Sequence, residues 1–520
     1  MLFNSGIFLF GFLPVALFGF FALGLLDLRK SAVVWLTLTS LVFYGWWNPG
    51  YLPLLIVSVV INFWIGRLLA RDRSRRLLIF GIALNLAALG YYKYAGFLAE
   101  TVDALLGLGL PIPHILLPLA ISFYTFQQIA YLCDSYDGLA KETSFASYSM
   151  FITFFPHLIA GPITHHKEMI PQFDAPEIFR PQAQMLAVGV TVFLIGLLKK
   201  VMIADTIAGY VDPAFSAAVA GNPLTFFEAW GGALAYTLQI YFDFSGYSDM
   251  AIGLGLMFGI RLPINFDSPL KASSIIDFWA RWHITLTRFV TAYIYNPITM
   301  KISRRRMAAG KPMPKRGRMS AGTFLELVAF PTILAFLIIG IWHGAGWQFA
   351  AFGLIHGLYL TVNHGWRAVK KSRKWDGADD GPAFEAAYVL LTLACVVVGL
   401  VFFRSPDIAS ASRYVASMTG LNGVVFHATE MLSPLQVELM AFLLMIVWLF
   451  PNTQEWLRRF PTGLGPIREP GWLERRLTNL GISTAWRPSP AFGVAVGLIG
   501  FFALARALSL APTEFIYFNF

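Results

Sequence analysis

Residues 324–362 read FLELVAFPTILAFLIIGIWHGAGWQFAAFGLIHGLYLTV, and this stretch decides the fold. Its first part, 324–341, is apolar and close to the roughly 20 residues with which an α-helix spans a bilayer. The run ends at IWHGAGW, where His343 lies between two tryptophans and precedes Gly344 and Gly346. An ionisable side chain in such a segment is expensive to bury, so His343 is a candidate for function.

Similar apolar runs recur along the whole chain. Of its 520 residues, 57% are hydrophobic and 13% are charged, about half the charged fraction of a soluble domain. The runs are too long and continuous for the strands of a barrel. We therefore predict an all-α polytopic membrane protein with about 11–13 transmembrane or re-entrant helices around a central tunnel. The clearest runs cover 6–26, 32–48, 51–66, 77–98, 182–198, 324–341, 386–403, 434–450 and 490–508.

The net charge of +10 is concentrated in loops. Basic residues crowd 67–76, 301–318 and 367–374, and the second of these loops holds eight Lys or Arg and no acid. Such runs also occur in proteins that bind nucleic acid, but in a membrane chain the excess of positive charge in cytoplasmic loops explains them better. We expect all three loops in the cytoplasm and no nucleic-acid partner.

This assignment also locates the histidine. Residues 319–366 lie between two of the basic loops, so the chain must cross the membrane and return within them. We expect two helices joined near Gly344–Gly346, with His343 at the end of the outgoing helix and the glycines permitting the reversal. On the returning helix, His356 and Asn363 are seven residues apart and share a face.

Three segments are irregular for membrane helices. Residues 115–136 and 151–173 contain prolines and polar side chains, and residues 243–259 are rich in Gly and Ser. Broken backbone at membrane depth is tolerated only where protein or a water-filled cavity surrounds it. We expect re-entrant or kinked segments here that line a pore. The two cysteines, Cys133 and Cys395, are expected to be small buried hydrophobic residues.

His343 and His283 are the first candidates for chemistry. A neutral imidazole can accept a proton and suits a general base, while the alternative for His343 is a hydrogen bond between helices. On a helix, Trp279 and Thr287 lie four residues to either side of His283 and share its face, and Asp277 pairs with Arg281. The alternative there is an amphipathic helix at the bilayer surface.

Asp243 and Asp249 have two interpretations. They hold a cation or proton, as in a transporter, or they anchor the helix bundle through hydrogen bonds to Ser and Tyr hydroxyls, which we favour slightly. His165 and His166 are adjacent, so their side chains diverge on a helix and do not form a metal pair. No HExxH or Walker-type motif is present, and we expect neither a metal nor a bound cofactor.

Together, these segments resemble the membrane-bound O-acyltransferase family, in particular the bacterial branch that acetylates alginate or adds D-alanine to teichoic acid. The resemblance runs from about Pro118 through the helix of His356. It implies a single domain over residues 1–520, in which residues of about 115–366 form the catalytic core. Over 290–300 the chain departs from the alginate type. The matching segments are PLAISFYTFQQIAYLCDSYDG (118–138), FFPHLIAGPI (154–163), IYFDFSGYSDMAIGLG (240–255), DFWARWHITLT (277–287), IWHGAGWQF (341–349), FGLIHG (352–357) and the ending FIYFNF (515–520).

The resemblance implies acyl transfer inside the membrane, between a thioester donor from the cytoplasm and a hydroxyl from the other side. It implies that His343 is essential and that His283 supports it as a second catalytic residue. Other residues of the matching segments are expected to line or support the tunnel: Trp342, Gly344, His356, Asp243, Arg281, Trp282 and His157.

We accordingly expect an enzyme of the bacterial inner membrane that transfers an acetyl group from acetyl-CoA to an alginate-like exopolysaccharide. A periplasmic acetyltransferase or the polysaccharide itself is the expected partner, beside the lipid bilayer. One alternative is transfer of D-alanine or a longer acyl group from a carrier protein. The other is a transporter or acyl channel that uses Asp243 and Asp249 without catalysis.

Overall fold

The computed structural model describes residues 1–113, 115–140, 144–311, 319–373, 375, 381–425, 431–467, 472–480, 485–509, 511 and 513–516. The chain is 76% helical. Within the described ranges, the extended pairing is a single isolated bridge between Pro263 and Leu464. The prediction of an all-α membrane protein is confirmed.

The helices follow one another with short connections. The first half of the chain forms α1 (Leu13–Leu25), α2 (Arg29–Gly45), α3 (Leu52–Asp72), α4 (Arg75–Leu89), α5 (Ala95–Leu106), α6 (Ile121–Tyr136), α7 (Phe145–Thr153), α8 (Phe155–Leu158), α9 (His166–Phe173), α10 (Ala183–Leu198), α11 (Asp205–Ala220) and α12 (Phe226–Met257). The second half forms α13 (Ile275–Trp279), α14 (Ile284–Val290), α15 (Asn296–Ala308), α16 (Ala321–Phe324), α17 (Phe330–His343), α18 (Trp347–Ser372), α19 (Gly381–Arg404), α20 (Ile408–Met418), α21 (Pro434–Leu449), α22 (Thr453–Trp456), α23 (Trp472–Asn479) and α24 (Pro490–Ser509).

Wide π-helical turns extend or link several of these helices. They cover Phe8–Phe12, Gly90–Tyr94, Lys199–Ala204, Thr291–Tyr295 and Leu325–Ala329. Such turns rotate the helix that follows and occur often at functional sites. Two of them contribute lysines that are important below.

Seven helical stretches in the described part of the chain are long and apolar enough to cross a membrane: Phe8–Leu25, Pro49–Asp72, Arg75–Leu106, Ala183–Ala220, Ala321–His343, Ala383–Arg404 and Pro490–Ser509. Each of the nine apolar runs in the sequence lies on a helix. The runs 32–48 and 434–450 are not among the seven because they form α2 and α21, of only 17 and 16 residues. The expectation of 11–13 segments also counted polar and re-entrant stretches, such as the one that forms α6.

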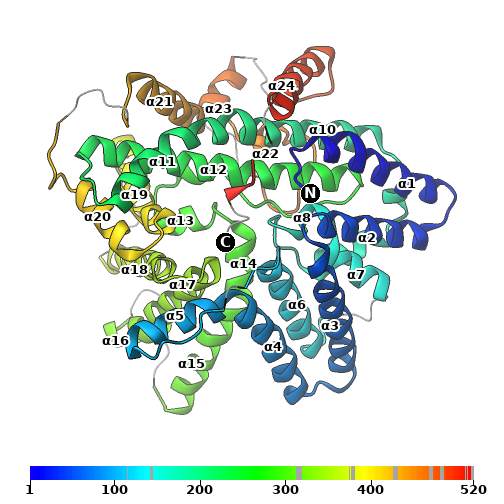
Figure 1. Cartoon of the computed structure of the whole chain (residues 1–520), viewed down its shortest axis with the longest axis horizontal. Helices are drawn as coiled ribbons and strands as arrows, with labels where there is room; N and C mark the ends of the chain where they lie inside the picture. The colour runs from blue at the N-terminus through cyan, green and yellow to red at the C-terminus, as the bar shows by residue number, and fades with distance from the viewer. Residues whose placement is uncertain are drawn as a thin grey trace.

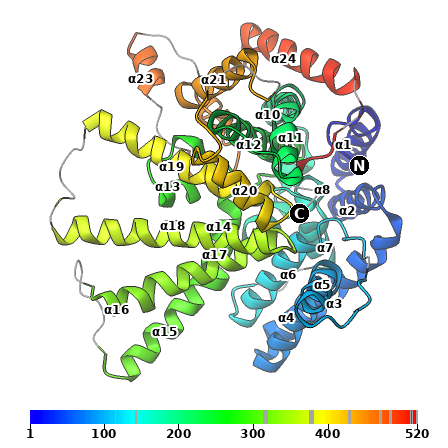
Figure 2. The same cartoon turned by 60° about the vertical axis from the view of Figure 1, so that its left-hand side comes forward.

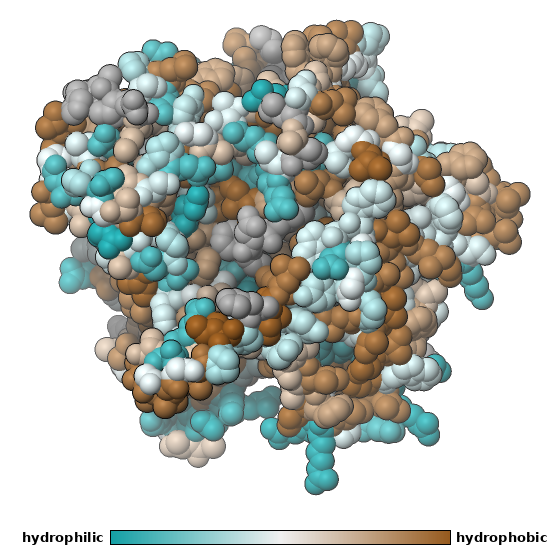
Figure 3. Space-filling view, in the orientation of Figure 1, coloured by the Kyte–Doolittle hydropathy of each residue, from teal (hydrophilic) through white to brown (hydrophobic). Residues whose placement is uncertain are grey.

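The helices surround a centre that contains α14 (Figure 1). The long helices α10 and α12 pack along one side, while α17 and α18 lie on another, and α3, α4 and α6 on a third (Figures 1 and 2). Apolar side chains cover the outer helices, where the hydrophobic colour is continuous along the edge formed by α1 and α2 (Figure 3). Phe18 on α1 is 77% exposed, as expected of a side chain that faces lipid.

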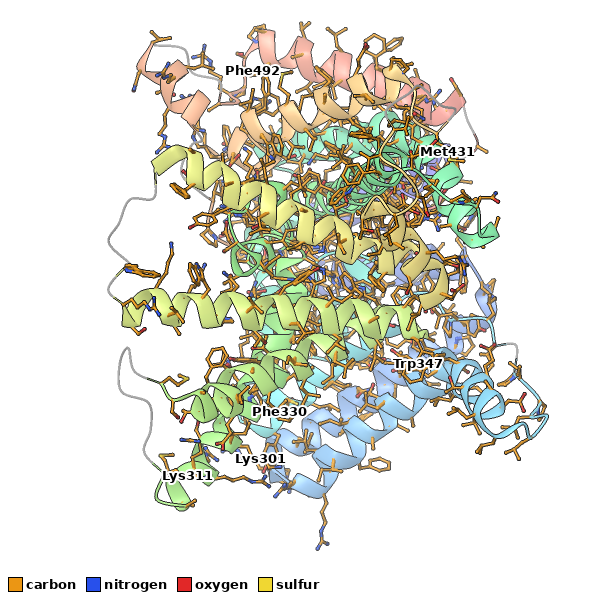
Figure 4. The ribbon with its side chains drawn as sticks, turned by 90° about the vertical axis from the view of Figure 1, so that its left-hand side faces the viewer. Lys301, Lys311, Phe330, Trp347, Met431 and Phe492 are labelled. Carbon is orange, nitrogen blue, oxygen red and sulfur yellow. The ribbon has the colours of Figure 1, made fainter. Side chains whose placement is uncertain are left out.

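α17 and α18 form the predicted pair of helices. Of the expected basic loop 301–318, residues 301–308 belong to α15 and 312–318 lie outside the described residues. Lys301 and Lys311 lie at the lower left in Figure 4, and Trp347 lies to the right of them, at the start of α18. α17 ends at His343 and α18 begins at Trp347, so the predicted reversal is confirmed. The two helices pack closely against each other. A Cβ at Gly340 of α17 would lie 2.2 Å from the carbonyl oxygen of Phe349 on α18, so there is no space for a side chain at this position. Small residues let membrane helices approach in this way.

The prediction of a kinked or re-entrant segment at 243–259 is wrong. Residues 243–257 belong to the uninterrupted helix α12. The glycines of α12 do not bend the helix but let it pack closely against α10. A Cβ at Gly253 would lie 2.5 Å from the backbone oxygen of Gly189 on α10, and Gly246 faces Gly196 in the same way. By contrast, residues 151–173 are broken into α7, α8 and α9, as expected.

The contact between α10 and α12 predicts a difference between two glycines. Gly253→Ala places a methyl group against backbone atoms, and we expect it to lower the free energy of unfolding by about 1–3 kcal/mol. Gly209→Ala on α11 is the control, because no atom lies within 4 Å of its added Cβ and alanine is the better helix former. Thermal unfolding in detergent measures both. Equal stability of the two variants would contradict the packing role.

Candidate active site

His343 is the last residue of α17 and is buried at the inner end of the reversal. Its ring lies 5.0 Å from that of Phe403 and 4.9 Å from that of Trp342, measured between ring centroids. Gly344 has φ −161°, so the expected need for glycine conformational freedom is wrong. Glycine is required by space, because a Cβ at Gly344 would lie 2.1 Å from the ring of Phe349.

His283 does not lie within a helix. α13 ends at Trp279, and His283 has φ +44° and caps α14, a left-handed conformation that costs free energy for a residue with a Cβ. The prediction that Trp279 and Thr287 share a helical face with His283 is therefore wrong, because the chain turns at 280–283. A strained backbone at a buried histidine is typical of a functional position.

Asn265 holds His283 in this conformation and fixes its tautomer. The Oδ1 of Asn265 accepts hydrogen bonds from Thr285, from its backbone N–H at 3.3 Å and its hydroxyl at 2.8 Å. The same oxygen lies 3.1 Å from Nδ1 of His283. Since Oδ1 is an acceptor, Nδ1 of a neutral His283 carries the proton and Nε2 carries the lone pair. The backbone oxygen of Asn265 also accepts from the N–H of Ile284 at 3.0 Å.

Trp342 joins the two histidines. Its ring lies 6.3 Å from the ring of His283 and next to that of His343. The indole stacks on Phe126 of α6 at 5.2 Å and meets Phe123 edge-on. The structure thus brings residues 283 and 342–343, which are far apart in sequence, into one buried group of aromatic and imidazole rings.

A cavity of about 900 Å³ lies beside this group, between α6, α9, α14 and the following π-helical turn. Trp279, Ile284 and Thr287 line it close to His283, while Met300 and Leu78 line it near the basic loops. Charged residues of both signs also face it: Asp134, Asp137, Lys167, Glu168 and Arg288. The lining extends from Met300 to Ile284, the residue that follows His283, and it does not include His283, Trp342 or His343.

Sequence comparisons identify the family. Residues 139–309 match the model of MBOAT, the membrane-bound O-acyltransferase family. The peptidoglycan O-acetyltransferase of Helicobacter pylori is 39% identical over 82% of this chain and 81% of its own length. The probable alginate O-acetylase AlgI of Pseudomonas aeruginosa is 37% identical over 80% of this chain and 75% of its own length. The chain belongs to the membrane-bound O-acyltransferase family. The teichoic acid D-alanyltransferase of Bacillus subtilis is a more distant relative, 28% identical over 51% of this chain.

The remaining histidines of this O-acyltransferase lie in separate settings. Nε1 of Trp279 donates to Nδ1 of His356 at 3.2 Å, and a Cβ at Gly399 of α19 would lie 2.4 Å from Nε2 of His356. Asn363 accepts from the N–H of Ile276 at 3.3 Å, so the predicted shared face of His356 and Asn363 is confirmed. His356 packs α18 against α13 and α19.

Two further predicted residues, Arg281 and Trp282, lie next to His283 in the chain, and the predicted pair of Asp277 and Arg281 is present. Arg281 pairs with Asp277, with Nε 2.9 Å from Oδ2. Trp282 is buried and stacks on Phe278 with 5.6 Å between ring centroids. Both side chains support the turn that carries His283.

His157 and the adjacent histidines of α9 lie on the α6 side of the cavity. His157 is buried, and its Nδ1 lies 3.4 Å from Nε2 of Gln127. His166 lies 3.5 Å from Asp134, and burial lowers the pKa of His166 below its ordinary value. Within the described ranges, no three His, Cys, Asp or Glu side chains converge as metal ligands do.

Asp243 and Asp249 are paired with lysines instead of the expected Ser and Tyr hydroxyls. Nζ of Lys200 lies 2.9 Å from Asp243 and 2.8 Å from Asp205, and Nζ of Lys199 lies 2.7 Å from Asp249. The sequence contained a signal for this, since two adjacent lysines follow the apolar run 182–198. The cations that contact these aspartates are therefore the ammonium groups of Lys199 and Lys200.

The end of the chain is fixed to the same pair. The backbone N–H of Ile516 donates to Asp243 at 3.0 Å, and Nζ of Lys200 donates to the carbonyl oxygen of Glu514 at 2.8 Å. Phe515 is fully buried, and Nζ of Lys200 lies 4.8 Å from the centre of its ring. Of the ending FIYFNF, residues 517–520 lie outside the described residues.

Asn265, which the sequence did not single out, is the residue to test. Asn265→Leu removes the acceptor that fixes Nδ1–H of His283, and we expect acyl transfer to fall by about 100-fold or more, as happens when a catalytic histidine loses its tautomer. Ser248→Ala is the control, because it removes the 3.2 Å partner of Nδ2 of Asn265 and leaves Oδ1 in place. Equal loss in both variants, measured per folded protein, would contradict the tautomer assignment.

Proposed function

We propose that this O-acyltransferase moves an acetyl group from a cytoplasmic thioester, acetyl-CoA, to a hydroxyl of an extracytoplasmic polysaccharide. The buried group of rings formed by His283, Trp342 and His343 carries the proposal, and a cavity lined by Ile284, the residue after His283, lies next to it in the chain. Relatives whose names state O-acetylation of alginate or peptidoglycan are 35–39% identical, whereas those named for D-alanyl transfer are 26–28% identical. This difference favours an acetyl group over D-alanine.

The reaction assigns a proton acceptor. The hydroxyl oxygen of the acceptor attacks the thioester carbon, its proton passes to the imidazole of His343, and the carbon–sulfur bond breaks. The proton then passes from His343 to the departing thiolate, so that no proton is gained or lost by the enzyme. A positioned base of this kind contributes about 10²–10⁴-fold to a rate.

The proposed role of His283 follows from its tautomer. In a neutral His283 the single N–H, on Nδ1, faces Oδ1 of Asn265, and Nε2 offers a lone pair. We assign to Nε2 the role of a hydrogen-bond acceptor that favours the imidazolium of His343, as the third member of a triad does. Backbone N–H groups near Gly344–Gly346 are then the proposed oxyanion donors.

The cavity is the proposed entrance for the donor. Lys167 and Arg288 in its wall are the proposed contacts for the phosphates of coenzyme A. The segment over 290–300, in which the sequence departs from the alginate type, forms one wall of the cavity through Tyr293, Asn296, Pro297 and Met300. We propose that this wall adapts the enzyme to its own donor and partner, while the core at about 115–366 in a single domain is shared with relatives.

The location follows from the same chemistry. Acetyl-CoA is a cytoplasmic metabolite and the acceptor is a cell-envelope polymer, so the enzyme is proposed to lie in the bacterial inner membrane. Its proposed partner is a periplasmic acetyltransferase or the polysaccharide itself, which receives the acetyl group at the far end of α17.

Two substitutions distinguish this enzyme from a transporter. His343→Ala removes the proposed base, and we expect no transfer of [14C]acetyl from acetyl-CoA by the full chain in proteoliposomes, with normal insertion. Asp249→Asn, which weakens the pair with Lys199, should retain transfer per folded protein. If His343→Ala keeps its activity and Asp249→Asn loses it, the catalytic proposal fails and a transport function is favoured.

A further inference from the structure

Lys93 is an ionisable residue in the membrane stretch Arg75–Leu106, and the sequence motifs do not include it. It lies in the π-helical turn Gly90–Tyr94 between α4 and α5. A lysine at such a position is expensive unless other groups receive its charge. In the described part of the chain, the ammonium group of Lys93 contacts three oxygen atoms, and two of them belong to Trp342 and His343.

Those two oxygens are backbone carbonyls at the end of α17. Nζ of Lys93 lies 2.5 Å from the carbonyl oxygen of Trp342 and 3.2 Å from that of His343. The third oxygen is the hydroxyl of Ser122 on α6 at 3.3 Å. The last carbonyls of an α-helix have no partner within the helix, and a cation there is also favoured by the helix dipole.

Tyr94 extends the same contact by one residue. Its hydroxyl donates to the carbonyl oxygen of Ile341 at 2.7 Å. Farther along, the ring of Phe97 on α5 lies 5.5 Å from that of Trp347, at the start of α18. The turn and α5 therefore follow the link between α17 and α18, and Figures 1 and 4 show this chain segment beside the link.

The wide turn explains how neighbouring residues reach one helix end. Successive side chains of a regular α-helix point about 100° apart, and Lys93 and Tyr94 lie at the end of a π-helical turn, where the spacing differs. The π-helical turn changes this geometry, and three consecutive carbonyls, those of Ile341, Trp342 and His343, receive hydrogen bonds from two consecutive side chains.

We propose that Lys93 and Tyr94 are positioning residues that fix the end of α17 and thereby the imidazole of His343. This inference rests on the proposed role of His343 in acyl transfer. Neither side chain needs to touch the substrate. Their effect comes from the backbone to which the imidazole is attached, where an error of about 1 Å lowers a rate by about 100-fold.

The first experiment separates positioning from stability. In the full chain in proteoliposomes, Lys93→Met should lower kcat for transfer from acetyl-CoA by about 100-fold, with KM for acetyl-CoA nearly unchanged. Lys93→Arg keeps a cation and donors, so it should restore a large part of kcat. Tyr94→Phe should lower kcat less, because only the bond to Ile341 is lost.

Tyr91→Phe is the matched control. It removes a phenolic hydroxyl from the same turn, on a side chain that is 59% exposed, and its kcat should equal that of the unmodified protein. If Lys93→Met has normal kcat, or if Tyr91→Phe loses as much as Tyr94→Phe, the proposal is overturned.

A second measurement does not depend on activity. Diethyl pyrocarbonate modifies imidazoles, and mass spectrometry of the peptide that contains His343 gives the rate. We expect faster modification in Lys93→Met than in Tyr91→Phe, because the end of α17 is no longer held. Equal rates would overturn the positioning role. If modification is faster in Lys93→Met but the unmodified protein does not transfer acetyl groups, the positioning role is supported and only the proposed function is rejected.

Discussion

The interior of a bilayer provides no water, so each buried polar group must find its partner within the protein. Two groups of contacts among the described residues show how this constraint is met. Asn62, Asn85 and Gln128 form a buried amide network between α3, α4 and α6, with bonds of 2.7–3.2 Å. Lys200 and Asp243 form a buried ion pair, and breaking such a pair by removing one member costs about 3–5 kcal/mol. His283, in the candidate active site, meets the same requirement through Asn265.

What is predictable from the sequence follows from the same constraint. Lipid sets the length of each apolar run, so the helices and the reversal after His343 could be predicted from residues near each other in the chain. The resemblance of short motifs indicated the family, which the comparisons confirm, and predicted His283 and His343 as candidate catalytic residues. The local sequence pattern was enough for each of these predictions, because every membrane-spanning helix must match the thickness of the bilayer by itself.

The errors and omissions concern contacts between distant residues. The glycines of 243–259 indicate a break when they are considered alone, but Gly189 and Gly196 on α10 explain them as a helix contact. The left-handed turn at His283 depends on Asn265, 18 residues earlier. Lys93 meets His343 across 250 residues. A single sequence does not show which distant residues meet, so neither partner could be found before the fold was known.

The π-helical turns have a consequence for the faces of the helices that contain them. Lys199 and Lys200 are consecutive, yet both reach aspartates of α12, just as Lys93 and Tyr94 both reach α17. Helical-wheel diagrams assume one uniform pitch and would place one member of each couple toward lipid. In this chain, the face of each residue that follows such a turn must therefore be read from the structure and not from a uniform pitch.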